Sequence, residues 1–520
     1  MGATRTIDDS PLLVGVDIGS TNIKADVYSS DGVSVAHAST PTVTHYPQPL
    51  WAFYDPEELW DAACKVIREA VGLLNDPRRI AGIAVASVGE AGIPVDREGN
   101  PAYDVIAWFD RRTIPQMEWL ARTIGESALF DVTGLSLHPI FSLCKLLWIR
   151  ENHPEVWQRT SRWLMVADFI AYRLSGEQAT DYSLASRTMA FNLAKRQWDS
   201  GLLSSVGVPP AIMAPVVQSG EAIGKVTRKA ALATGLPEGS VVGAGGHDHV
   251  CGALAAGVVE HGQMLDSMGT AEALFFPRDQ PITDPAAGRL GYTQGAHVAP
   301  GKYYIFGGLY TSGASVEWLR DILGHAEHAS LIAEAAAVPA GSLGVSFVPH
   351  LRLSNAPHPD PKARAAFLGM TTDVTRGVLM RAVFEGLGYE ARATIEPVLE
   401  FSQLDAMPEV FVIGGSARND LLLSIKSSIL NTPFQIVGHD EATSLGAAML
   451  GGLAAGVYQD ASDALHRVRS LPRQIHPIEE QAVLYDRYFH DIYLHIYDVL
   501  KPLNHQIHNL MVCENEQAPA

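Results

Sequence analysis

Asp248 and the two histidines beside it are the first residues that suggest chemistry, in the stretch GGHDHVCG at residues 245–252. Two glycines precede the carboxylate, and an alanine-rich run with helical spacing follows it. The pattern leaves three interpretations open. Asp248 is the N-cap of the following helix, or His247, Asp248 and His249 together bind a metal. In the third interpretation, Asp248 is a catalytic base on a glycine turn that lets a substrate come close.

The stretch VGVDIGSTNIK near the N-terminus is a second candidate site. Gly19 permits a tight turn, so the backbone N–H groups of Ser20 and Thr21 can point at an anion. Asp17, at the end of the apolar segment, is placed to hold a metal-bound water beside that anion, and Lys24 adds a positive charge. The alternative interpretation is an ordinary hairpin turn with a solvated lysine.

Two further glycine turns follow apolar segments in the second half of the chain. DSMGT repeats the order of a carboxylate, a short turn and a Gly-Thr pair, so Gly269 and Thr270 are candidates for a similar anion contact. In VFVIGGSARND, an apolar strand runs into Gly415 and Ser416, and we expect a helix to begin at Asn419 or one residue later. A helix N-terminus of this kind can bind a phosphorylated or planar group.

The turn at Gly415 has neither the spacing of a Rossmann motif nor that of a Walker motif. Each of the three turns alone is also consistent with a plain connection between elements. Because all three follow apolar strands and they are spread over both halves of the chain, they predict a nucleotide in a cleft between two duplicated domains.

The elements that must position these residues belong to a large α/β protein. Residues 12–40 alternate apolar and polar side chains and predict two or three antiparallel strands. Asp55 then marks the start of an amphipathic helix that runs to about Leu74, and the apolar stretch IAGIAVASVG predicts a buried strand. The segment 110–200 has a helical character with many tryptophans. A domain boundary is expected near residues 250–262.

The composition of the 520 residues limits the class of protein. The chain is 47% hydrophobic and 18% charged, as soluble globular proteins are. Its formal net charge of −19 argues against nucleic acid and anionic membranes as partners. The four cysteines form no CxxC pair, and the N-terminus lacks a secretory signal, so we expect a cytoplasmic enzyme.

Eight stretches, in this order, resemble the FGGY family of carbohydrate kinases. They are GVDIGSTNIKADVY, IAWFDRRT, SLCKLLWIREN, GGHDHVCGALAAG, DSMGT, GASVEWLRD, RAVFEGLGYEAR and VIGGSARND…TSLGAAMLGG. The resemblance implies two actin-like (ribonuclease H-like) ATPase domains flanking a central cleft. It divides the chain into an N-terminal domain at 10–255, a C-terminal domain at 256–500 and a tail at 501–520, and it allows a homodimer.

The resemblance also implies a role for each matching residue. Asp248 would be the catalytic base, taking the proton of a sugar hydroxyl that attacks the γ-phosphorus of ATP. Asp17 would hold Mg²⁺, through water. The residues that match ATP-binding positions are Ser20, Thr21, Lys24, Gly269, Thr270, Gly313, Glu317, Gly415, Ser416 and Asn419.

On the substrate side, Glu90 keeps the carboxylate of the Arg-Glu pair that glycerol kinase-like members have, but the arginine is lost. Glu90 is expected to bind sugar hydroxyls, and the alternative is that it is only a turn residue. Asp110 matches a W-x-D-x-R element and is expected to bind the substrate or to support residues that do. Ile140 departs from the family signature. His249 is expected to bind a sugar hydroxyl or, like His247, to change the pKa of the base.

The expected activity is that of an ATP-dependent kinase for a small sugar, with a ketopentose such as xylulose first among the substrates. Another ketose, a polyol or an aldonate is the alternative. Two other classes share part of the pattern. An actin-like ATPase has the phosphate motifs without a base at the sugar position, whereas a ligand-sensing pseudokinase would be expected to lose Asp248 or the phosphate turns, and this chain retains both.

Overall fold

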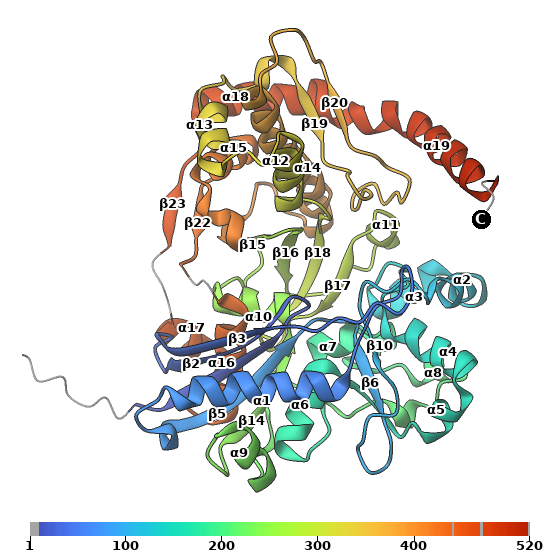
Figure 1. Ribbon diagram of the computed structural model, residues 1–520, viewed down its shortest axis with the longest axis vertical. Helices are drawn as coiled ribbons and strands as arrows, with labels where there is room; N and C mark the ends of the chain where they lie inside the picture. The colour runs from blue at the N-terminus through green and yellow to red at the C-terminus, as the bar shows by residue number, and fades with distance from the viewer. Residues whose placement is uncertain (1–9, 439–440, 469–471, 518–520) are drawn as a thin grey trace, which may run out of the picture.

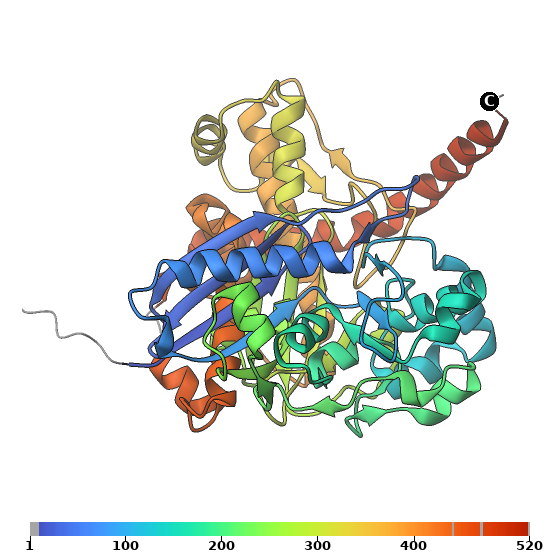
Figure 2. The same cartoon turned by 60° about the horizontal axis from the view of Figure 1, so that its bottom comes forward.

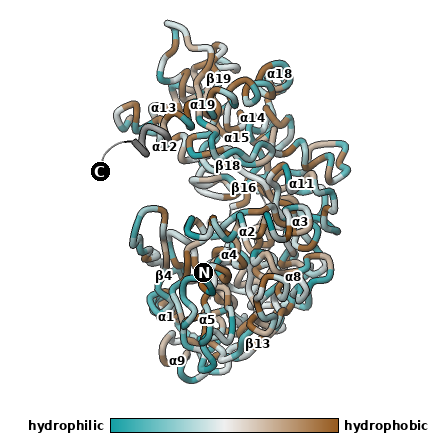
Figure 3. The backbone as a smooth tube through the Cα atoms, turned by 90° about the vertical axis from the view of Figure 1, so that its right-hand side faces the viewer, coloured by the Kyte–Doolittle hydropathy of each residue, from teal (hydrophilic) through white to brown (hydrophobic). Residues whose placement is uncertain are grey.

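The structure is a computed structural model that describes residues 10–438, 441–468 and 472–517. It has two lobes, each built around a mixed β-sheet, and Figure 1 and Figure 3 show them one above the other. The first lobe contains α1 (Pro56–Gly72), and the second contains α14 (Arg376–Ser402). No helix in the described part of the chain is long and apolar enough to cross a membrane.

The first sheet starts from the hairpin that the sequence predicted. β1 and β2 are antiparallel, β2 pairs with β3 in the same sense, and β1 runs parallel to β5. The strands stand in the order β13 (Ala222–Lys225), β14 (Val241–His247), β5 (Ile80–Ser87), β1 (Leu12–Ile18), β2 (Asn22–Ser29) and β3 (Ser34–Pro41).

The second sheet repeats this plan. β15 and β16 form an antiparallel hairpin, and β15 runs parallel to β21. The order is β17 (Thr293–Ala296), β18 (Tyr303–Leu309), β16 (Glu272–Arg278), β15 (Gln263–Met268), β21 (Glu409–Ile413), β22 (Phe434–Ile436) and β23 (Arg473–Ile475). In both sheets a three-residue turn joins the two strands of the hairpin, at 19–21 and at 269–271, so the predicted duplication holds at these turns.

A helical insertion extends the first lobe between β5 and β13, as the composition of this segment predicted (Figure 2). Short strand pairs anchor it, β4 (Phe53–Tyr54) with β7 (Val105–Ile106) and β6 (Gly92–Val95) with β8 (Arg162–Met165). Its longer helices are α2 (Ile114–Thr123), α3 (Glu126–Thr133), α4 (Ser142–Asn152) and α6 (Val166–Ser175), and the short α7 (Tyr182–Ser186) follows.

The longer helices that surround α14 lie on the side of the second lobe away from the first lobe (Figure 1). The long α14 packs against α12, α13 and α15. These neighbouring helices are α12 (Gly313–Ile322), α13 (His328–Ala336) and α15 (Asp420–Leu430), and α18 (Glu479–Tyr488) and α19 (Leu494–Gln517) follow them in the chain. Because α19 is continuous through residue 501, the predicted tail at 501–520 begins inside a helix.

Two helices, α10 (Asp248–Ala255) and α16 (Ala442–Ala454), join the lobes. They cross so closely that a Cβ added at Gly446 would lie 2.0 Å from the carbonyl oxygen of Cys251. α16 belongs to the second half of the sequence, yet it packs on the first sheet, where a Cβ added at Gly15 would lie 1.7 Å from the carbonyl oxygen of Ser444. A buried apolar cluster that draws on both sheets surrounds the crossing.

Several elements are where the sequence placed them. Asp55 caps α1 by accepting the backbone N–H groups of Glu57 and Glu58, with Pro56 as the first helical residue. α15 begins at Asp420, with Asn419 as its N-cap. The division between the domains at residues 255 and 256 remains a prediction.

Candidate active site

Asp248 is the first residue of α10 and follows β14 directly. The N-cap position belongs to His247, so the interpretation of Asp248 as the N-cap is wrong. The Asp248 side chain is 21% exposed, and its Oδ1 accepts the backbone N–H of His249 at 2.6 Å. Burial raises the pKa of this carboxyl above its usual value, with the charge of Glu90 adding to the shift.

The glycines before Asp248 permit close packing, whereas the sequence predicted that they form a turn. Gly245 and Gly246 lie in strand β14 and form no turn. A Cβ added at Gly245 would lie 1.8 Å from the carbonyl oxygen of Val85 in β5, and one at Gly246 would lie 2.6 Å from Cγ1 of Val298. These glycines therefore permit close packing against neighbouring segments of the chain, and they hold the start of α10 in place.

The two flanking histidines differ in their surroundings. His247 is buried, and burial lowers the pKa of its imidazole well below the usual value, so the ring is neutral. Its Nε2 lies 3.2 Å from Oδ1 of Asp248, within reach of a hydrogen bond. The His249 side chain is 44% exposed and stands 6.0 Å, centroid to centroid, from the ring of Phe306.

Glu90 is held by an arginine that no motif in the sequence marks. Arg187, the residue after α7, donates from Nε to Oε1 of Glu90 at 2.6 Å, and both side chains are buried. The guanidinium also lies 5.1 Å from the ring centroid of Phe141 and donates to Thr293 of the second lobe at 3.4 Å. Glu90 thus has an arginine partner that comes from a position far away in the sequence.

Glu90 is also held through its backbone. Its φ is +63°, in the left-handed region, and its carbonyl oxygen accepts hydrogen bonds from the ammonium of Lys145 at 3.1 Å and from the hydroxyl of Ser142 at 2.9 Å. Both donors come from α4. The helical insertion therefore fixes the backbone of Glu90. Glu90 and Arg187 both contribute to the electrostatic surroundings of Asp248.

The hydrogen bonds of Asp110 favour the role of supporting other residues of the protein. Its Oδ1 accepts the backbone N–H of Arg112 and the Nε of the same residue, and its Oδ2 accepts Nη2 of Arg112 and the backbone N–H of Ala52. The side chain has no exposed surface. The guanidinium of Arg112 lies over the ring of Trp51, 4.0 Å from its centroid. Both carboxylate oxygens are thus occupied by groups of the protein, which favours support over direct substrate contact.

Asp17 has the properties of a residue that binds a cation. Its Oδ1 is buried and has no hydrogen-bond partner among the described residues. Burial, followed by the charge of Asp248, raises its pKa to about 8. A divalent cation would supply the missing partner, because hard cations prefer carboxylate oxygens. Asp17 therefore fits Mg²⁺, directly or through a water molecule, on the side of the site that faces Asp248.

Lys24 makes an ion pair that the sequence did not predict. It stands opposite Asp17 in the β1–β2 register, and its Nζ lies 2.5 Å from Oε2 of Glu441 at the start of α16. Glu441 also adds to the charge that raises the pKa of Asp17. The pair connects the first hairpin to the helix that comes from the second half of the chain.

The predicted phosphate and nucleotide residues of the second lobe lie close together. The backbone N–H of Gly313 donates to the carbonyl oxygen of Gly269 at 3.0 Å, and Ala314 donates to that of Thr270 at 3.1 Å. A Cβ added at Gly313 would lie 2.7 Å from the Gly269 oxygen and 3.4 Å from Oγ of Ser416. The turn after β15, the start of α12 and the turn after β21 therefore meet at one place.

The turn after β21 leaves space for a flat group. Gly414 has a φ of +101°, and a Cβ there would lie 2.5 Å from the carbonyl oxygen of Met268, so only glycine fits. A Cβ added at Gly415, in contrast, would meet nothing within 4 Å. Asn419 uses its Oδ1 to accept the backbone N–H of Leu422 at the start of α15. The backbone at Gly415 is therefore open to a ligand.

Glu317, a predicted ATP-binding residue, forms two ion pairs within the second lobe. Its Oε2 lies 2.7 Å from Nη2 of Arg320, and its Oε1 lies 2.8 Å from Nε2 of His328. The second of these ion pairs ties α12 to α13 within the second lobe. The carboxylate is thus paired within its own lobe, and of the two α12 residues Gly313 contacts the predicted phosphate turn at Gly269.

The sequence analysis did not predict a buried ion network that lies behind the turn at residues 269–271. Lys426 of α15 donates to Oδ2 of Asp266 at 2.5 Å and to Oε1 of Glu272 at 2.7 Å, and none of the three side chains has exposed surface. The other oxygen of Glu272 accepts the hydroxyl of Ser312 at 2.7 Å. Burial and the charge of Glu272 raise the pKa of Asp266 to about 7, and Lys426 opposes the shift.

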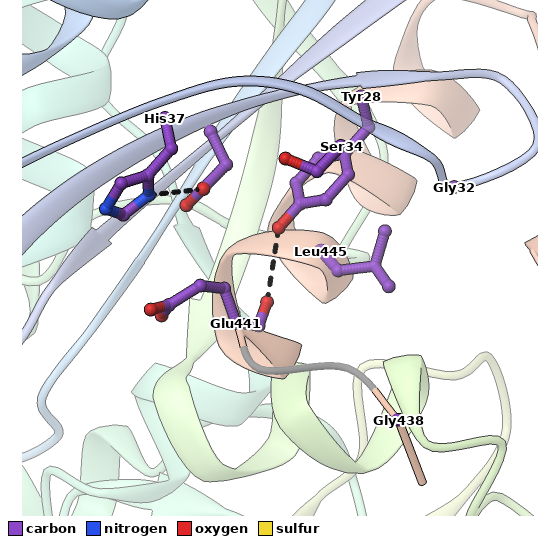
Figure 4. Close-up of a pocket in the computed structure, with 8 residues that line it drawn as sticks. Tyr28, Gly32, Ser34, His37, Gly438, Glu441 and Leu445 are labelled. Atoms are coloured by element: carbon purple, nitrogen blue, oxygen red, sulfur yellow. Dashed lines mark hydrogen bonds and ion pairs between the residues drawn. The ribbon is translucent and has the colours of Figure 1, made fainter. Parts of the chain in front are cut away.

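A cavity of about 340 Å³ lies beside the Lys24–Glu441 pair (Figure 4). Its two carboxylates are each paired with a basic side chain, Asp26 with His37 at 2.7 Å and Glu441 with Lys24. The β2–β3 hairpin supplies one wall and the start of α16 the other, so relative movement of these elements would change its shape. It is lined by Asp26, Tyr28, Gly32, Ser34, His37, Gly438, Glu441 and Leu445.

Comparison with known proteins assigns this arrangement to a family. Residues 12–255 match the N-terminal domain of the FGGY family of carbohydrate kinases, and residues 264–455 match its C-terminal domain. A glycerol kinase of Citrifermentans bemidjiense is 33% identical over 485 residues, which cover 90% of this chain and 95% of that protein. A xylulose kinase of Bacillus subtilis is 26% identical over 494 residues, with 95% and 98% covered.

The crystal structure of xylulose kinase from Rhodospirillum rubrum resembles this one with a TM-score of 0.87 at 28% sequence identity, and the match covers 95% of this chain and 100% of that one. The predicted fold of two actin-like domains is confirmed by this likeness and by the two mixed sheets. The chain therefore belongs to the FGGY family of carbohydrate kinases, and it is an ATP-binding phosphotransferase with an alcohol group as acceptor.

Proposed function

We propose that this kinase transfers the γ-phosphoryl group of Mg·ATP to a hydroxyl of a small sugar, most favourably a ketopentose such as xylulose, with Asp248 as the base. The observation that carries the proposal is the position of Asp248. Its carboxylate stands at the start of α10, within electrostatic influence of both the Glu90–Arg187 pair and the buried carboxyl of Asp17. A base between a polar substrate pocket and a phosphate site is what phosphoryl transfer requires.

The nucleotide would lie along the turns that face each other from the two lobes. Backbone N–H groups at Ser20, Thr21 and Thr270 would contact its phosphates, and the open backbone at Gly415 would contact the adenosine. Bound at Asp17, Mg²⁺ would neutralise charge on the phosphates. To bind a phosphate oxygen, Lys24 would have to release its ion pair with Glu441. Otherwise, the ion pair would serve to hold α16 in place.

Asp248 would accept the proton of the attacking hydroxyl. The N–H of His249 orients the carboxylate, and the neutral ring of His247 adds no positive charge that would weaken it as a base. A pKa raised by burial strengthens this role, because a base works best when its pKa approaches the working pH. Water exclusion by closure of the lobes would keep the phosphoryl group from hydrolysis.

The substrate assignment draws support from the relatives and from the pocket. The xylulose kinase of Bacillus subtilis matches nearly the whole length of both chains. The Glu90–Arg187 pair offers one acceptor and one donor group, which suits a substrate with several hydroxyls.

Glycerol is the second candidate, because Arg187 rebuilds the arginine–carboxylate pair whose arginine is missing next to Glu90 in the sequence. The glycerol kinase relative at 33% identity supports this alternative.

A panel of acceptors tests the proposal. D-xylulose, other ketoses, glycerol, longer polyols and gluconate would each be incubated with Mg·ATP, and ADP release would be measured against a reaction without acceptor. We expect strong stimulation by one of them, with the highest kcat/KM for a ketopentose. Equal ADP release with and without every acceptor would favour the actin-like ATPase and contradict the proposal. No ADP release under any condition would favour the pseudokinase and contradict it as well.

A further inference from the structure

One carboxylate oxygen of Asp26 has no partner at the wall of the cavity beside the Lys24–Glu441 pair. Asp26 lines this cavity and is 1% exposed. Its Oδ1 lies 2.7 Å from Nδ1 of His37, but its Oδ2 is buried and has no hydrogen-bond partner within residues 10–438, 441–468 and 472–517. Because buried polar atoms are nearly always hydrogen-bonded, this oxygen points to a partner from outside the chain.

Ser444 lies near Asp26, but its hydroxyl is already engaged. The group is close enough to lower the pKa of Asp26. A hydroxyl has a single proton, and Ser444 donates it to the carbonyl oxygen of Glu441 at 3.1 Å. The hydroxyl of Tyr28 lies 2.9 Å from the same Ser444 oxygen and can donate to it. Ser444 is therefore satisfied by its neighbours, and Oδ2 of Asp26 keeps its capacity to accept.

Glu441 brings a second acceptor to the cavity. Its Oε2 is paired with Lys24, whereas its Oε1 forms no hydrogen bond with any residue that the structure describes. Burial raises the pKa of Asp26, and the charge of Glu441 adds to the shift, although Ser444 and His37 oppose it. A raised pKa means that the surroundings do not fully compensate the negative charge. The cavity thus favours a cation.

The size and the walls of the cavity favour an organic cation over a metal ion. Its volume of about 340 Å³ is far larger than the roughly 30 Å³ that one water molecule takes in the liquid. Figure 4 shows the carboxylate of Glu441 and the ring of His37 on one side and the apolar Leu445 on the other. Among the residues with described positions, no group of three or more His, Cys, Asp and Glu could hold a metal ion.

These features define a ligand with two separated positive charges and an apolar connection between them. We propose that the cavity binds a small aliphatic diamine, whose two ammonium groups donate to Oδ2 of Asp26 and to Oε1 of Glu441 while its methylene groups lie against Leu445. Alkyl amines are protonated at neutral pH, as lysine is. Hydrogen bonds between an ammonium and a carboxylate are about twice as strong as those between neutral groups.

The site has a consequence for Lys24, which rests on the proposed contact of this lysine with a phosphate of ATP. Lys24 and the diamine share one carboxylate, because Glu441 offers Oε2 to the lysine and Oε1 to the ligand. A second cation on Glu441 weakens its hold on Lys24, so the lysine is released more easily. A bound diamine therefore favours the binding of ATP.

Binding is tested by isothermal titration calorimetry without nucleotide, at physiological salt, with 1,4-diaminobutane as the probe. We expect a saturable signal with one molecule per chain. 1-Butylamine, which has one charge, and 1,4-butanediol, which has none, should each bind at least about tenfold more weakly. The absence of saturable binding, or equal binding of the diol, would overturn the proposal. Full displacement of the diamine by an equal concentration of MgCl₂ would identify a metal site and overturn it as well.

Two variants locate the binding. Asp26→Asn keeps the shape of the side chain and its acceptor for His37, and Glu441→Gln removes the other charge. Each should weaken the diamine at least about tenfold, with thermal unfolding showing that the fold is kept. The matched control is Asp61→Asn, which removes the same charge from an exposed position of α1 and should bind as the wild type does. If both variants also bind as the wild type does, the diamine is attracted only by the net charge of −19, and the proposal is wrong.

The effect on Lys24 is measured by equilibrium titration with a fluorescent ATP analogue, which requires no turnover. Saturating 1,4-diaminobutane should tighten the binding of the analogue severalfold in the wild type and leave it unchanged in Asp26→Asn. Equal affinity with and without bound diamine in the wild type would contradict the coupling to Lys24. A chain that binds the diamine but no ATP analogue would count against the proposed kinase reaction and not against the diamine site.

Discussion

At the scale of single residues, the site depends on how the surroundings of Asp248 change the chemistry of an ordinary carboxyl group. The neutral His247 ring, the backbone N–H of His249 and the Glu90–Arg187 pair approach it from different elements. The sequence left three roles open for Asp248, which lies between a strand and a helix, and the role of base came only from the resemblance to the family. The sequence did not allow us to predict Arg187, since an arginine acting across 97 residues of sequence leaves no local pattern.

Asp248→Asn should keep the fold and the affinity for ATP, because the amide has the shape of the carboxylate and can still accept the N–H of His249. Turnover should fall by about 10²–10⁴, the range that a general base contributes. Steady-state kinetics gives the turnover, and equilibrium titration with a fluorescent ATP analogue gives the affinity. A variant with near-normal turnover would show that another group accepts the proton.

The raised pKa of Asp248 also predicts the pH dependence of catalysis. The base works only when ionised, and a carboxyl whose pKa is raised stays protonated to a higher pH than its ordinary value of 3.8 would allow. The value of kcat/KM should therefore fall as the pH decreases through that raised pKa, well before an ordinary aspartate would titrate. A profile of kcat/KM between about pH 4 and pH 9 checks this. Activity that stays level down to pH 4 would contradict it.

At the scale of elements, two hairpins and two helix starts carry the residues that we propose bind the nucleotide. The three-residue tips of β1–β2 and β15–β16 were predictable, because glycine, hydroxyl and carboxylate residues cluster there between apolar strands. The close approach of Gly313 to Gly269 was not predictable from spacing, since it joins a hairpin to a helix more than forty residues later in the chain. Likewise, Glu317 lies beside a predicted motif but forms ion pairs within its own lobe.

Lys426→Met tests the ion network behind the second hairpin. The change removes the cation and leaves Asp266 and Glu272 as buried carboxyl groups facing each other. Breaking one partner out of a buried pair costs about 3–5 kcal/mol, so the urea midpoint of the second lobe should fall clearly. The exposed Lys195→Met is the matched control and should shift stability by less than about 0.5 kcal/mol.

Replacing all three residues together, Lys426→Met with Asp266→Leu and Glu272→Gln, should restore part of the lost stability, because no uncompensated charge remains buried. If Lys426→Met is as stable as the wild type, the network has no structural role.

At the scale of the whole molecule, the two lobes share their packing. The apolar cluster around α10 and α16 draws on both sheets, and α16 reaches the first sheet from the second half of the sequence. The sequence predicted two duplicated domains, but it did not show that a helix of the second half covers the first sheet. The clearest sequence signal for this packing is glycine at the contact, at Gly15 and Gly446. Because glycines occur for many other reasons, these two did not predict it.

A fragment that ends at residue 261 should therefore fold poorly on its own. Its sheet would expose the face that α16 covers, so we expect weak near-ultraviolet circular dichroism and binding of a hydrophobic dye. Mixing with a fragment of residues 262–520 should restore the signal and the kinase activity. The control is the same pair in which the second fragment carries Gly446→Val, which should not pack. A first fragment with native-like spectra alone would contradict this expectation.

The position of α16 has a consequence for synthesis in the cell. β14 is the last strand of the first sheet in the chain, and it pairs with β5. The helix that covers this sheet, α16, begins about 200 residues later. At about 5–20 residues per second, the ribosome needs roughly 10–40 s to produce that stretch. During this interval the nascent chain carries an apolar surface without its cover, which makes it a client for chaperones at the ribosome and makes its yield sensitive to the pace of translation.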